Sequence, residues 1–131
     1  MRIRWGRIVA GGFLVEAIII AGFFAILFGT RLAGAPTIAL PETPIDFANA
    51  IISSFVVTLL VARWVCRPVE AHHVLHGVLV GVVAILIFVA LTQARPEPAL
   101  YILAHGLKLA GGATGGYLAK RKRVAAQGLS Y

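Results

Sequence analysis

Residues 74–91 read VLHGVLVGVVAILIFVAL, and the only strongly polar side chain among them is that of His76. An unbroken apolar run of this length comes close to the roughly 20 residues that a helix needs to cross a hydrocarbon core ~30 Å thick. The run is too long for a buried strand, and it lacks the polar face that a surface helix of a soluble protein carries. This stretch therefore predicts a membrane-spanning helix.

The rest of the chain repeats the same pattern. Of its 131 residues, 60% are apolar and only 13% are charged, which excludes an ordinary soluble domain. All six prolines lie between the apolar runs or at the start of the last one, where proline is tolerated. We predict an all-α, polytopic membrane protein that forms one domain over residues 1–131. Its four transmembrane helices are expected at about 8–28, 47–65, 74–92 and 98–119, followed by a basic C-terminal tail at 120–131.

The positions of the cations predict the orientation. Lys and Arg near helix ends favour the cytoplasmic side. One side of the predicted topology collects Arg2, Arg4, Arg7, Arg63, Arg67, Lys120, Arg121, Lys122 and Arg123, and the other has only Arg31 and Arg95. Both termini are therefore expected in the cytoplasm. A cleaved signal peptide is a lesser alternative, because Ala33, Gly34 and Ala35 form a small-residue pattern after the first run.

The net charge of +7 does not indicate a nucleic-acid partner. The cations flank hydrophobic runs instead of forming a basic face on a soluble fold. The partner we expect is the lipid bilayer, and other membrane subunits or a second copy are further candidates. Cys66 is the only cysteine, which excludes an internal disulfide, and its position between Arg63 and Arg67 predicts the reducing cytoplasmic side.

Glu16, His105 and Lys108 are polar residues inside apolar runs. A charged side chain near the bilayer centre costs at least ~3 kcal/mol, so Lys108 should face the interior or a wet cavity. Helix rise places Glu16 and Lys108 about one turn apart in depth. Their side chains lean in opposite directions on antiparallel helices, which leaves both a direct contact and a bridge through water or His105 open. A structural ion pair and a proton or ligand site are both compatible with this pattern.

Glycines recur along the third and fourth runs at the four-residue spacing of GxxxG motifs. Such surfaces let two helix backbones approach closely inside a membrane. Packing within one monomer and packing against another subunit remain open. The residues expected at these contacts are Gly77, Gly81, Gly111, Gly112, Gly115 and Gly116.

Histidines at the start of the third run are weak metal candidates. His72 and His76 are four residues apart, but no third ligand follows at the spacing of a zinc site. Water and lipid headgroups at the interface explain them equally well. Haem or pigment ligation by His76 or His105 is a further possibility, although we expect these two histidines near opposite membrane faces. We predict no metal site and no cofactor.

Two resemblances are visible. The segment YILAHGLKLAGGATGGYLAKRKR (101–123), with HGVLVGVVAILIF (76–88) before it, resembles the C-terminal hairpin of small four-helix bacterial membrane proteins of unknown function. The segment GGFLVEAII (11–19) is similar to the first helix of small multidrug-resistance transporters. The second resemblance implies that Glu16 binds protons and cationic drugs. The chain departs from that family in its long Pro-rich first loop, its strong charge bias and Lys108.

No nucleophile elbow, phosphate-binding loop, catalytic carboxylate pair or dinucleotide fingerprint occurs in the sequence. We therefore expect a non-enzymatic, multi-pass protein of the bacterial inner (cytoplasmic) membrane. Its predicted role is that of a small structural or accessory subunit that interacts through its glycine-rich helix faces. The alternative is a small proton- or cation-coupled transporter that uses Glu16 and Lys108, and a lesser one is a haem- or pigment-binding subunit.

Overall fold

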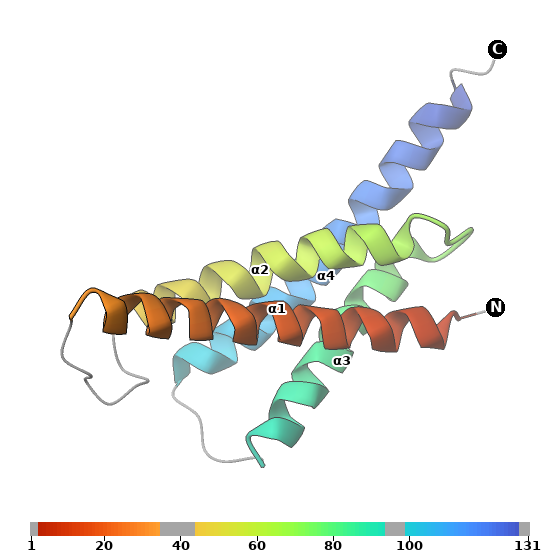
Figure 1. The fold of residues 1–131 in the computed structure, drawn as a ribbon. Helices are drawn as coiled ribbons and strands as arrows, with labels where there is room; N and C mark the ends of the chain where they lie inside the picture. The colour runs from red at the N-terminus through yellow and green to blue at the C-terminus, as the bar shows by residue number, and fades with distance from the viewer. Residues whose placement is uncertain (1–2, 35–43, 94–98, 129–131) are drawn as a thin grey trace.

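The computed structural model describes residues 3–34, 44–93 and 99–128. This part of the chain forms four helices, shown in Figure 1: α1 (Trp5–Leu32), α2 (Pro44–Cys66), α3 (His73–Leu91) and α4 (Ala99–Gly128). The prediction of an all-α, four-helix chain is confirmed. Most of the two loops predicted on the far side, at 30–46 and 92–98, lies outside the described residues, namely 35–43 and 94–98.

The helices end near the predicted positions, with two differences. α1 extends beyond both predicted ends, from Trp5 to Leu32, and α4 continues past residue 119 through the basic segment to Gly128. Alanine, lysine and arginine are strong helix formers, so charge alone does not stop a helix that has already started. α2 ends two residues before Pro68, since proline disfavours helical geometry in the residue before it.

Three of the described helices are long and apolar enough to cross a membrane: α1, residues Ala48–Cys66 of α2, and α3. α4 does not belong to this group: its part before the basic segment 120–123 contains Lys108, His105 and five glycines, which lower its hydropathy. Its predicted role as a fourth span remains a prediction.

The interior of the bundle contains small, β-branched and polar residues such as Ile8, Val15 and Thr58, whereas leucine and aromatic side chains lie nearer the surface. No Leu, Phe, Tyr or Trp is buried among the residues whose burial is described. Phe13, Leu86 and Ile102 are each about 60% exposed or more. In water this surface would aggregate, and in lipid it meets acyl chains. The distribution is the one expected of a membrane-embedded bundle.

α4 packs most extensively against α2 and α3, and α1 packs against α2 and α3. Within the described residues, the backbones of α1 and α4 make no close approach. The start of α1, the turn between α2 and α3, and the end of α4 lie toward one end of the bundle (Figure 1). We call this the basic end, because its segments carry Arg4, Arg7, Arg63, Arg67 and residues 120–123.

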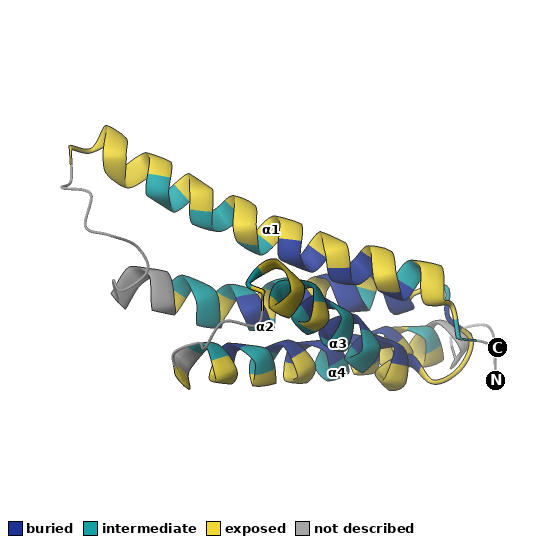
Figure 2. Cartoon of the chain, turned by 90° about the horizontal axis from the view of Figure 1, so that it is seen from below, coloured by how far each residue is buried: buried dark blue, intermediate teal, exposed yellow. Residues whose placement is uncertain are grey.

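α1 is deeply buried only in its first half, although Ile19 still packs against the core. Its buried residues are Ile8, Gly11, Gly12, Val15 and Glu16. No residue of α1 after Glu16 is buried, and every residue of this helix is described. Figure 2 shows the second half of α1 diverging from α2 and α4. Glu16 is thus the last point at which α1 is enclosed by the other helices.

Candidate functional site

Glu16 and Lys108 form a direct ion pair inside the bundle. Lys108 Nζ donates a hydrogen bond to Glu16 Oε1 over 2.6 Å. The two side chains are only 2–3% exposed. Because the backbones of α1 and α4 do not approach each other closely, these two long side chains bridge the space between them. The structure thus shows the direct contact, although side chains on antiparallel helices lean apart.

Aromatic rings from α3 and α4 line the lysine side of the pair. Lys108 Nζ lies 4.9 Å from the centre of the Phe88 ring, within the range of a cation–π interaction. The same ring meets His105 edge-on at 5.1 Å between centroids and stacks on Tyr101 at 6.1 Å. His105 therefore lies beside the site as part of an aromatic cluster. These contacts hold the ammonium group at a fixed place in a low-dielectric environment.

Two hydroxyl groups of α2 lie at the same level of the bundle, and the sequence analysis did not single them out. Ser54 and Thr58 are 2% and 0% exposed. A Cβ added to Gly111, one turn after Lys108, would lie 2.5 Å from the carbonyl oxygen of Phe55. Thr58 therefore lies on the turn of α2 that packs against Gly111 of α4, one turn after Lys108. Their four-residue spacing puts both hydroxyls on one helix face, but hydroxyls are common in membrane helices, so this spacing alone does not single them out.

Two buried oxygen atoms at this level have no hydrogen-bond partner in the described protein. They are Glu16 Oε2 and Thr58 Oγ1. An unsatisfied buried oxygen is costly, and ordered water is a common remedy. The pair itself can hold helices together, and with access to water a carboxylate could also exchange protons.

All six glycines predicted at helix contacts lie between helices of the same chain. Gly77 and Gly81 of α3 face the backbone of α4, where an added Cβ at Gly81 would lie 2.7 Å from the carbonyl oxygen of Lys108. Gly112 and Gly116 face α3 in return, and Gly111 and Gly115 face the backbone of α2. Within this chain, both faces of α4 that carry glycines are therefore covered by neighbouring helices.

The histidines at the basic end do not converge on a metal. His72 precedes α3 in a left-handed backbone conformation, with φ of 56°. His76 Nδ1 lies 3.0 Å from the His72 carbonyl oxygen. His76 Nε2 accepts a hydrogen bond from the Arg4 amide over 3.5 Å. Both ring nitrogens of His76 are engaged, which disfavours haem ligation there. Within residues 3–34, 44–93 and 99–128, no group of three His, Cys, Asp or Glu side chains could hold a metal ion.

Cys66 closes the turn between α2 and α3, a role that the sequence did not indicate. Its buried thiol donates a hydrogen bond to the His73 carbonyl oxygen over 3.3 Å. Arg123 of α4 also holds this turn, since its Nη1 donates to the Val69 carbonyl oxygen over 2.6 Å. The basic end is thus fixed by contacts from three helices.

The chain has no match among family models, curated proteins or solved structures. The two resemblances seen in the sequence therefore stay predictions.

Proposed function

We propose that the chain is a multi-pass membrane protein without enzymatic activity that serves as a small structural or accessory subunit. The observation that carries this proposal is the direct contact between Glu16 and Lys108. Glu16 and Lys108 are both almost completely buried and neutralise each other, so this ion pair joins α1 to α4. A buried pair of this kind fixes the arrangement of helices, a role for which buried polar groups are best attested.

The partner surface in this proposal is the second half of α1. The glycine faces, which we expected to meet a partner, already contact neighbouring helices of the same chain. Phe24 and Phe28 are 60% and 66% exposed and lie in the second half of α1, where no residue is buried. The occupant we propose is the apolar transmembrane surface of another subunit.

Replacing both Phe24 and Phe28 with alanine is expected to release the chain from its assembly after extraction in mild detergent. The two rings are the largest exposed apolar side chains of this half of α1, so their removal takes away much of its apolar contact area. Size-exclusion chromatography with light scattering measures the change. Phe13→Ala is the matched control, because Phe13 is 59% exposed on the first half of the same helix and should leave the assembly intact. Equal loss in both variants, or a wild-type protein that is already monomeric, would contradict the proposal.

We further propose that the basic end faces the cytoplasm and that the membrane is the bacterial inner membrane. Support comes from the cations, because those assigned to one side by the sequence lie on segments that gather at one end of the bundle.

Cysteine labelling tests this orientation in intact cells of a Cys66→Ala background. A thiol at exposed Ala33, after α1, should react with an impermeant maleimide added from outside, whereas a thiol at exposed Lys122 should react only after the membrane is opened. The reverse pattern would invert the topology.

A proton- or cation-coupled carrier is the second candidate. One observation favours it, namely that Glu16 Oε2, on the last buried residue of α1, and Thr58 Oγ1 of α2 are buried without a hydrogen-bond partner within the described residues. Proton flux into proteoliposomes that is present in the wild type and abolished in Glu16→Gln would establish this candidate. Under the accessory role, wild type and variant give the same background leak.

A further inference from the structure

A basic pocket lies between α2 and α4 at the basic end of the bundle. Its volume is about 310 Å³, and its lining consists of Arg63, Arg67, Ala119, Lys122 and Arg123. Four of these five residues are cations, and none is an acid. A site that gathers positive charge from two helices in this way is electrostatically suited to an anion.

Close packing of the two helices builds this pocket. A Cβ added to Gly115 would lie 2.9 Å from the backbone nitrogen of Arg63, so the last turn of α2 rests directly on α4. One turn further along α4, the small buried side chain of Ala119 leaves room where a larger residue would fill the space. Lys122 and Arg123 follow three and four residues after Ala119, which puts them on the same helix face.

One cation of the pocket is held in place before any ligand arrives, and another has a buried donor without a partner. Arg123 is fixed by its 2.6 Å hydrogen bond to the Val69 carbonyl oxygen. Arg63 Nε is buried and has no hydrogen-bond partner within the described protein. A buried guanidinium donor without an acceptor is expensive, so this atom indicates a missing anionic acceptor.

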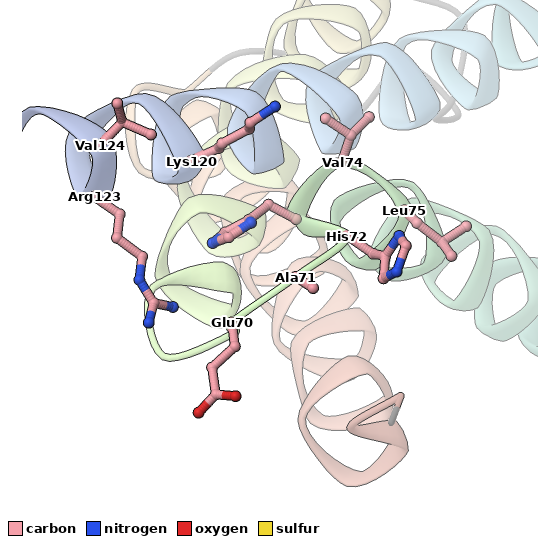
Figure 3. A pocket seen from close by; sticks show the side chains of 9 residues that line it. Glu70, Ala71, His72, Val74, Leu75, Lys120, Arg123 and Val124 are labelled. Carbon is pink, nitrogen blue, oxygen red and sulfur yellow. The ribbon is translucent and has the colours of Figure 1, made fainter. Parts of the chain in front are cut away.

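The nearest acidic side chain does not supply that acceptor. Glu70 lines a neighbouring pocket of about 490 Å³, which shares Arg123 with the first. Figure 3 shows the Arg123 side chain reaching toward the turn between α2 and α3, while Glu70 extends from this turn without its carboxylate meeting the guanidinium group. The positive charges of the basic pocket therefore remain without a carboxylate among its lining residues.

The position of the pocket indicates where an anion would come from. Trp64, next to Arg63, is 52% exposed, and Arg7 lies over its ring at 5.7 Å. Exposed tryptophan at the end of an apolar helix marks the level of the lipid headgroups. Basic pockets between transmembrane helices at this level suit the head groups of anionic lipids.

We infer that the pocket of Arg63, Arg67, Lys122 and Arg123 binds a phosphate group, with the phosphodiester of an anionic lipid as its source. Arginine guanidinium groups match phosphate oxygens in pairs, and a lysine adds a mobile point charge. The bound phosphate neutralises the cations that α2 and α4 bring together and so stabilises the contact between these helices.

Thermal unfolding of the full chain in neutral detergent tests this inference. Phosphatidylglycerol is titrated in one arm, phosphatidylcholine in a second and inorganic phosphate in a third. We expect phosphatidylglycerol to raise the unfolding midpoint and phosphatidylcholine to leave it unchanged. A rise with inorganic phosphate but not with phosphatidylglycerol would support the phosphate site and assign it to the free ion. No rise with either would overturn the inference.

Charge-matched variants separate a site from general attraction to a basic surface. Lys122→Gln should weaken the apparent affinity for phosphatidylglycerol at least tenfold. Arg121→Gln removes the same charge from the adjacent exposed position, which does not line the pocket, and should change the affinity less than twofold. Equal losses in the two variants would contradict a defined pocket. Native mass spectrometry of retained lipid gives an independent readout if either variant unfolds too early to titrate.

Discussion

Lys108→Met is expected to lower the free energy of unfolding by about 3–5 kcal/mol, the cost of leaving one charge of a buried pair without its partner. In the variant, Glu16 Oε1 would lose the ammonium group that donates to it, and Oε2 already has no hydrogen-bond partner within the described protein. The interaction of the ammonium group with the Phe88 ring would be lost as well. Reversible unfolding in mixed micelles, followed by circular dichroism, measures the change.

Lys120→Met provides the matched control for this prediction. The substitution is the same and lies on the same helix, but Lys120 is exposed. Its effect should stay within about 0.5 kcal/mol, as for most surface substitutions. If Lys108→Met costs no more than Lys120→Met, the level of Glu16 is open to water and the pair does not hold the bundle together.

Gly112→Ala is expected to destabilise the chain by about 1–3 kcal/mol, the usual cost of overpacking a close contact. The added Cβ would lie 2.9 Å from the carbonyl carbon of Gly77 and 3.4 Å from the Cα of Val78. Both are backbone atoms, so relief requires α3 and α4 to move apart. Unfolding in the same mixed micelles measures the loss.

Gly106→Ala on the same helix should have the opposite sign. An added Cβ there meets nothing within 4 Å. Alanine is the better helix former by roughly 1 kcal/mol, so this variant should be neutral or more stable than the wild type. Similar destabilisation by both substitutions would show that the glycines act through chain flexibility and not through close contact.

The helices could be predicted from the sequence because each apolar run is bounded by prolines and cations. Length and hydrophobicity are local properties, so the order and approximate ends of the helices follow without knowledge of their packing. The extension of α4 to Gly128 was missed, because positive charge marks the edge of a membrane but does not end a helix. The divergence of α1 after Glu16 could not be predicted either, since its second half is as apolar as its first.

The site was only partly predictable, for a related reason. Glu16 and Lys108 stand out because charge is rare in an apolar run, and their similar depth made them candidate partners. Ser54 and Thr58 do not stand out, since hydroxyls are tolerated in membrane helices and only tertiary packing shows that they are buried. The same holds for His76, whose two ring nitrogens contact the backbone of His72 and Arg4. Such contacts depend on how a turn and a chain terminus meet the bundle.

The most direct test of a structural role for the buried pair is the free energy of unfolding of Glu16→Gln combined with Lys108→Met. We predict that the double variant is more stable than either single variant and lies within about 1.5 kcal/mol of the wild type, since exchanging both charges together leaves no unpaired ion. A double variant destabilised by the sum of the two single losses would show that Glu16 and Lys108 act independently, and would contradict the account.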